Sequence, residues 1–108
     1  MAGNMVMRAV PGTNAYLGTG ETLMVVRGAT LGLGQPDMVQ VRDDEGMPLF
    51  ETSVSALLTE AGHPQKPGDG LARIIAVEIA ADQQLCAIIE INKGYTSVRV
   101  PFDYAPGK

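Results

Sequence analysis

The C-terminal third of the chain contains three runs rich in β-branched and other aliphatic residues, 71–80, 84–92 and 95–100, separated by very short gaps. Runs of this composition, bounded by turn residues, are typical of β-strands. Gaps this short leave room only for tight turns, so consecutive strands must run antiparallel. The sequence therefore predicts a three-stranded antiparallel meander over 71–100, around which the rest of the chain must fold.

The hairpin between the last two strands turns at Lys93-Gly94, a good two-residue loop. This turn pairs Ile89 with Val98, whereas a slip of one residue would set Ile89 against Ser97. Because such a slip moves every side chain to the other face, the apolar pattern selects the register. The other expected pairs are Ile91 with Thr96, Ala87 with Val100, and Glu90 with Ser97.

The loop length and register of the preceding hairpin follow from the same argument. A three-residue loop at 81–83 pairs Ile75 with Ile89, whereas a two-residue loop would place Ile75 opposite Glu90. We therefore expect the longer loop, with Ile79 opposite Leu85 and Val77 opposite Ala87.

These registers divide the meander into two faces. The first is aliphatic and must be the main core: Ile75, Val77, Ile79, Leu85, Ala87, Ile89, Ile91, Val98 and Val100. The second carries Ile74, Ala76, Glu78, Cys86, Ile88, Glu90, Tyr95, Ser97 and Arg99. Its centre is apolar, although a solvated antiparallel face is normally polar there. The second face is therefore expected to be covered by a helix or by another subunit, with plain exposure as the remaining alternative.

A short helix is predicted over 53–61. Thr52 or Ser53 can cap its N-terminus, and Gly62 is suited to the position after its C-terminus. Its apolar stripe follows helical spacing and consists of Val54, Leu57, Leu58 and Ala61. A helix of this length is stable only when packed against another element.

The N-terminal half contains four further short strand signals, at Met5–Val10, Thr22–Arg27, Met38–Arg42 and Leu49–Glu51. The resulting fold class is α+β and mostly β, with about seven short antiparallel strands in a barrel-like or rolled sheet. The order of the N-terminal strands is left open. A length of 108 residues and 45% hydrophobic residues favour one globular domain, 1–108, with ragged ends at 1–4 and 101–108.

Composition excludes several functions. One Cys and one His rule out a disulfide framework, a Cys-based zinc cluster and multi-His metal sites. A formal net charge of −4 with eight scattered Lys and Arg residues disfavours nucleic-acid binding, including by an SH3-like barrel. The glycine-rich segment 28–34 lacks the Gly-Lys-Ser/Thr ending of a phosphate-binding loop, so no cofactor is predicted.

The chain start lacks the basic region and apolar run of a signal peptide. Its longest apolar stretches, 74–81 and 85–91, are far below the roughly 20 residues needed to span a bilayer. Together with the single thiol, these features predict a soluble cytoplasmic protein without membrane contact.

Candidate polar residues are few. Glu78, Glu90 and Arg99 form the one charged constellation that strand pairing brings together, and Glu90–Arg99 is the expected cross-strand ion pair. A polar binding site centred on Arg99 is the alternative. His63, just past the helix, is interpreted as a capping or solvated residue, with acid–base work beside Asp69 as the alternative.

Two other groups have structural interpretations. Cys86 is expected to be a small apolar filler, because the nearby Glu78 would raise its pKa and disfavour the thiolate. The carboxylates of Asp37, Asp43, Asp44 and Glu45 lack the ligand order of a calcium loop. The segment 43–46 instead matches a hairpin turn, so no metal is predicted.

These observations predict a small binding protein without an evident catalytic centre that self-associates, most simply as a homodimer, through the second face. The expected interface residues are Ile74, Ala76, Cys86, Ile88 and Tyr95. The alternative is a small ligand-binding barrel or enzyme with a pocket under the loops 28–36 and 62–70. The ligand of such a pocket is left open.

Overall fold

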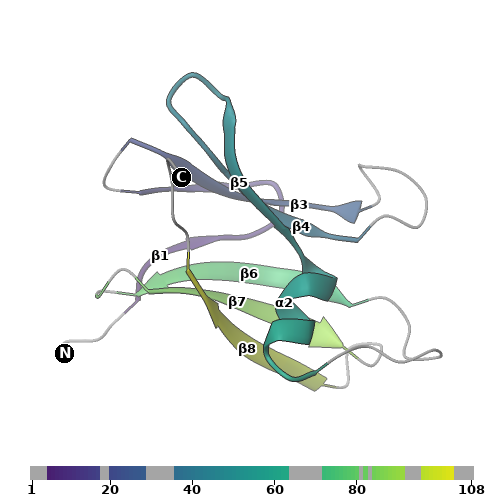
Figure 1. The fold of residues 1–108 in the computed structure, drawn as a ribbon. Helices are drawn as coiled ribbons and strands as arrows, with labels where there is room; N and C mark the ends of the chain where they lie inside the picture. The colour runs from purple at the N-terminus through teal and green to yellow at the C-terminus, as the bar shows by residue number, and fades with distance from the viewer. Residues whose placement is uncertain are drawn as a thin grey trace.

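A computed structural model describes residues 5–17, 20–28, 36–63, 72–80, 82, 84–91 and 96–103. Within these ranges the chain forms eight strands and one described helix (Figure 1). In chain order they are β1 (Met5–Ala9), β2 (Asn14–Tyr16), β3 (Thr22–Val26), β4 (Met38–Arg42), β5 (Pro48–Ser53), α2 (Val54–Glu60), β6 (Arg73–Ala80), β7 (Leu85–Ile91) and β8 (Thr96–Phe102).

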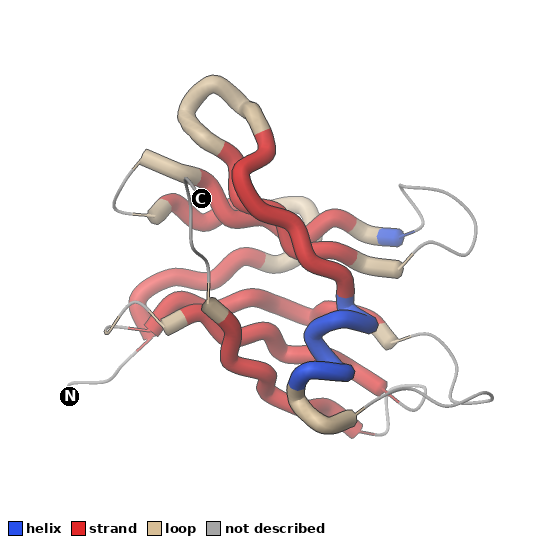
Figure 2. The backbone as a smooth tube through the Cα atoms, viewed as in Figure 1, coloured by secondary structure: helices blue, strands red, loops and turns tan. Residues whose placement is uncertain are grey.

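The strands form two antiparallel sheets of four strands each. Sheet A has the order β1-β6-β7-β8 and contains the predicted meander, and sheet B has the order β2-β3-β4-β5 (Figures 1 and 2). The fold is therefore α+β and mostly β, as predicted. The described strands form two packed sheets, not a closed barrel. The sequence interpretation missed β2, because a strand of three residues has too little pattern to detect.

The hydrophobic core lies between the two sheets. β3 and β4 alternate strictly between half-buried and buried residues, so each directs every second side chain inward. Sheet A supplies the opposite wall of the core, and Phe50 of β5 and Phe102 of β8 have their ring centroids 6.3 Å apart between the two sheets. The largest fully buried residues are Leu23, Leu57, Leu58, Ile74, Ile79, Ile89, Val39, Val41, Val54 and Val77.

Helix α2 follows β5 directly and ends in a Schellman motif. The Ser53 hydroxyl accepts a hydrogen bond from the Ala56 amide at the N-terminus. At the C-terminus, Gly62 has a φ of 84° and its N–H donates to the Thr59 carbonyl, while His63 N–H donates to Leu58. Both predicted caps are thus confirmed.

The helix does not cover the second face of the meander, contrary to one alternative considered above. Its buried residues Val54, Leu57 and Leu58 join the core, and it lies between β5 of sheet B and β8 of sheet A (Figure 1). The first face of the meander is instead covered mainly by sheet B. The helix closes one end of the space between the sheets.

The predicted registers hold over most of sheet A. Ile89 pairs with Val98 and Ala87 with Val100, and across the other hairpin Val77 pairs with Ala87. The remaining expected pairs are also present: Ile91 with Thr96, Glu90 with Ser97, and Ile79 with Leu85. The last strand continues through Phe102, which is buried, so residues 101 and 102 were wrongly assigned to a ragged end.

One register prediction is wrong because β6 contains a β-bulge at Ile75. Ile74, not Ile75, pairs with Ile89, and the pairing shifts between Ile74 and Ala76. An extra residue inverts the alternation beyond it. Ile74 is therefore fully buried in the core, whereas Ile75 is 39% exposed.

Candidate functional site

The outer face of sheet A is the candidate site, because it holds most of the residues singled out from the sequence. Strand pairing arranges its residues in three rows across the sheet. The first row is Arg8, Glu78, Cys86 and Pro101, the second is Ala76, Ile88 and Arg99, and the third is Arg73, Glu90 and Ser97.

Glu78 is the buried charged residue of this face. Its side chain is 8% exposed, and its two carboxylate oxygens bind different arginines. Arg8 Nη2 lies 3.1 Å from Oε2, and Arg99 Nη2 donates to Oε1 over 2.8 Å. A buried carboxylate needs such partners because removing its charge from water is costly. The arginines are more than half exposed, so each guanidinium can still contact another molecule.

The ion pair predicted between Glu90 and Arg99 is replaced by one between Glu78 and Arg99. Arg99 extends across β7 to reach Glu78 on β6, where Arg8 approaches the same carboxylate from β1. Glu90 instead has Arg73 as its strand partner, and neither belongs to an ion pair within the described residues. Burial explains the choice, because the less solvated carboxylate gains more from a cation.

Cys86 lies half-buried between Glu78 and Pro101 in the first row. Burial is the main cause that raises the pKa of its thiol, Arg99 opposes this effect, and Glu78 adds to it. The direction agrees with the sequence expectation. A raised pKa keeps the thiol protonated at neutral pH, so Cys86 is unsuited to act as a nucleophile.

The predicted apolar centre is smaller than expected. Ile74 belongs to the core because of the bulge, and Ala76 is fully buried. Cys86 and Ile88 are half-buried and remain on the face, whereas Tyr95 lies outside the described residues. The apolar centre that the structure describes thus consists of Ala76, Cys86 and Ile88.

Sequence reasoning missed two charged residues of this face, Arg8 and Arg73. Arg8 reaches it only because β1 pairs with β6, a contact between distant parts of the chain. Arg73 reaches it because the bulge at Ile75 shifts the register of the residues that precede it, so that Arg73 pairs with Glu90. Each of these arginines lies within a segment that the sequence predicts to be a strand. Only the observed strand pairing shows that both are on the same face of sheet A.

His63 is exposed at the end of α2 and takes no part in the face described above. Its backbone N–H donates to the Leu58 carbonyl as part of the Schellman motif, whereas the role of its side chain at the helix end stays a prediction. Asp69, and most of the loops 28–36 and 62–70, lie outside the described residues. The pocket predicted beneath those loops is therefore not described.

The acidic residues considered for calcium are separated by β4. Asp37, before β4, is buried and accepts hydrogen bonds from Gly28 N–H, Ile74 N–H and Arg27 Nη1. Asp43, after β4, accepts from the amides of the predicted turn, Glu45 and Met47. Within the described part of the chain, no group of three or more potential ligands could hold a metal ion.

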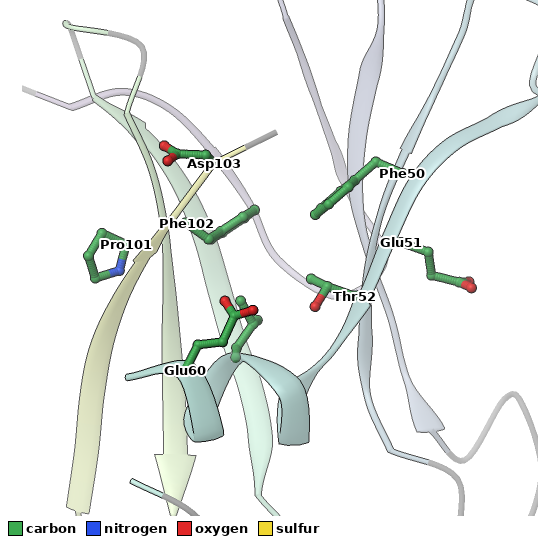
Figure 3. Close-up of a pocket in the computed structure, with 8 residues that line it drawn as sticks. Phe50, Glu51, Thr52, Glu60, Pro101, Phe102 and Asp103 are labelled. Carbon is green, nitrogen blue, oxygen red and sulfur yellow. The ribbon is translucent and has the colours of Figure 1, made fainter. Parts of the chain in front are cut away.

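A second candidate region is a cavity of about 340 Å³ between β5, α2 and β8. Figure 3 shows Phe50 and Phe102 on opposite sides of it, with Thr52 and Glu60 nearer the helix. Sequence reasoning did not predict this cavity, because it depends on how the edges of two sheets meet.

Comparison with known proteins finds no match for this chain among protein-family models, curated proteins or solved structures. The part of the chain that the structure describes contains no helix long and apolar enough to cross a membrane.

Proposed function

We propose that this protein is a binding module that self-associates through the outer face of sheet A. The observation that carries the proposal is the arrangement of Arg8, Glu78 and Arg99 beside Ile88. An apolar centre with a charged rim is the usual anatomy of a protein–protein interface. The partner is a second copy of the chain, related by a two-fold axis.

Charge is distributed on this face in a way that suits recognition. Of the five arginines, Arg27 binds Asp37 and Arg42 binds Gln40, while the other three lie on the outer face of sheet A. Glu90 and Arg73 add charges of opposite sign in one row. A mixed-sign surface can be complementary to itself, because a cation of one copy can face a carboxylate of the other.

Glu78 also prepares the face for binding. Each arginine is anchored to it by one guanidinium nitrogen, so the side chain is ordered before a partner arrives. Ordering a long side chain on association costs about 0.5–1.5 kcal/mol. Anchoring the two arginines in advance therefore favours tighter binding.

Two of the four edge strands, β5 and β8, are less suited to self-association than this face. Pro48 begins the edge strand β5, and Pro101 lies within the edge strand β8. Proline has no N–H to donate to an added strand and is a common protection of sheet edges. Association through the outer face of sheet A does not meet this obstacle.

Size-exclusion chromatography with light scattering tests the proposal. We expect a dimer that dissociates on Ile88→Glu, because the new carboxylate would be buried at the centre of the contact. Met24→Glu is the matched control, since half-buried Met24 faces outward from sheet B. Ser97→Glu, at an exposed position of the same face, should weaken the dimer even if Ile88→Glu misfolds. A wild type that stays monomeric at high concentration would refute self-association.

The proposed compartment is the cytoplasm, supported by the single free Cys86, which a reducing compartment would preserve. Neither a cofactor nor a metal is required for the proposed binding role.

A further inference from the structure

We propose that Arg73 and Glu90 determine how two copies of this chain recognise each other, by forming two reciprocal ion pairs across the dimer. Arg73 of one copy binds Glu90 of the partner subunit, and Glu90 of the first copy binds the partner's Arg73. This inference rests on the self-association proposed above and specifies its geometry. The two residues share one row on the outer face of sheet A, where strand pairing sets them opposite each other on β6 and β7.

Arg73 and Glu90 carry the charges of this face that have no ion pair among the described residues. The ion pairs of the face instead join Arg8 and Arg99 to Glu78. Arg73 is exposed and Glu90 is half-buried, so both charged groups are accessible to another molecule. Strand partners of this kind have Cβ atoms about 4.5–5.5 Å apart, so the two opposite charges start from adjacent points of the surface.

Two-fold symmetry makes such an adjacent pair of opposite charges complementary to itself. In a two-fold dimer, each contact between two different residues occurs twice, once in each direction. Two sheets that pack with aligned strands can be related by an axis that runs along the strands or across them. An axis along the strands, midway between β6 and β7, places β6 opposite β7 and β1 opposite β8 of the partner. This axis sets Arg73 of each copy against Glu90 of the partner subunit.

Two other positions of the axis bring like charges together. An axis along β7 would set Glu90 against the partner's Glu90. An axis across the strands, through the row of Ile88 and Arg99, would set Arg99 against the partner's Arg99. Like charges that face each other across an interface are costly. The axis between β6 and β7 avoids both clashes, and it places Ile88 opposite the partner's Ala76, so no charge faces the apolar centre.

The position of the pair suits a role in specificity. Arg73 and Glu90 lie one row away from Ile88, at the rim of the proposed contact. Charges at a rim suppress wrong partners and fix the register of two surfaces more than they add affinity. Arg73 and Glu90 are therefore specificity-determining residues, whereas Ile88 supplies the apolar contact.

Mixing two charge-reversal variants tests this assignment. Arg73→Glu and Glu90→Arg should each weaken homodimerisation about tenfold or more, because two attractive contacts become repulsive. An equimolar mixture of the two should form heterodimers about as tightly as the wild type dimerises, since both intersubunit pairs again join opposite charges. Analytical ultracentrifugation measures the affinities, and native mass spectrometry separates heterodimers from homodimers by mass.

The mixture reports on the intersubunit contact alone. Each single variant carries like charges at positions 73 and 90 of its own chain, and mixing does not change this. Recovery of the dimer on mixing therefore cannot come from repair within one chain. A double variant, Arg73→Glu with Glu90→Arg, should also dimerise on its own, and it keeps the test decisive if a single reversal misfolds.

Arg42→Glu and Glu45→Arg are the matched controls, because they reverse the same kinds of charge on sheet B and in its exposed β4–β5 turn. Both should dimerise like the wild type. A monomeric wild type refutes self-association and this inference with it. A wild-type dimer that Ile88→Glu dissociates but that survives both reversals, or a double variant that stays monomeric, overturns only the role of Arg73 and Glu90.

Discussion

Ile74 donates its backbone N–H to the carboxylate of Asp37 over 2.9 Å, and this bond joins the bulged start of β6 to the segment that enters β4. The same carboxylate binds Arg27 and the Gly28 amide, each at 2.7 Å. The Asp37 carbonyl accepts from Val54 N–H at the start of α2. One buried residue therefore connects both sheets and the helix.

Replacing Asp37 should destabilise the fold strongly. Asp37→Ala leaves a partly buried arginine and two buried amides without their acceptor, so we expect a loss of about 3–5 kcal/mol in the free energy of unfolding. Urea denaturation measures this loss. Asp44→Ala, in an exposed turn position, should change stability by less than about 0.5 kcal/mol. Similar values for the two variants would contradict the role assigned to Asp37.

The bulge makes two adjacent isoleucines energetically different. Ile74→Ala removes a fully buried side chain and should cost about 2–5 kcal/mol of unfolding free energy. Ile75→Ala removes a side chain that is 39% exposed, so we expect a cost below about 1 kcal/mol. The reverse order of the two losses in thermal or urea unfolding would support a regular register without the bulge.

Glu78→Gln should destabilise the protein by about 1–2 kcal/mol, because the buried amide can no longer neutralise either arginine. The exposed arginines limit the coupling energy of each pair to about 1 kcal/mol at most. Double-mutant cycles with Arg8→Met and Arg99→Met measure these couplings. A coupling for Glu90 with Arg99 that exceeds the one for Glu78 with Arg99 would restore the pair expected from the sequence.

The reactivity of Cys86 should report on its charged neighbours. Burial raises the pKa of the thiol, so alkylation by iodoacetamide should have its pH midpoint above that of an exposed cysteine. Arg99→Met removes a group that lowers this pKa and should move the midpoint higher, whereas Glu78→Gln should move it lower. Arg42→Met, on sheet B, should leave the midpoint unchanged.

The raised pKa of the Cys86 thiol also sets the sign of a pH effect on stability. The native state holds this proton more tightly than the unfolded state, so the contribution is present at neutral pH. It is lost as pH rises through the native pKa. Cys86→Ala should therefore reduce the fall in stability on the alkaline side, as measured by urea unfolding in a pH series.

Local patterns in the sequence were enough to predict most of the strand pairing in sheet A and the position of α2. The pairs Ile89–Val98 and Val77–Ala87 follow from matching apolar residues across short turns, and Gly62 marks the helix end through its backbone freedom. These features depend on residues close together in the chain, which a pattern can capture.

Features that depend on distant contacts were missed. The bulge at Ile75 is accompanied by a hydrogen bond from Ile74 to Asp37, 37 residues earlier in the chain. Arg8 joins Glu78 only through the pairing of β1 with β6. Neither contact produces a periodic pattern in the sequence of its own segment. The bulged register and the ion-pair partners of Glu78 could therefore be identified only from the structure.

The position of β1 has a consequence for how the protein is made. Its partner β6 follows all of sheet B and α2 in the chain, although the two strands lie side by side (Figure 1). During synthesis, β1 leaves the ribosome long before β6, whereas the contiguous strands β2 to β5 can pair as they emerge. Sheet A can be completed only after closure of a long loop, which slows folding and exposes an unpaired strand in the meantime. The N-terminal strand β1 is thus among the last strands to pair during folding.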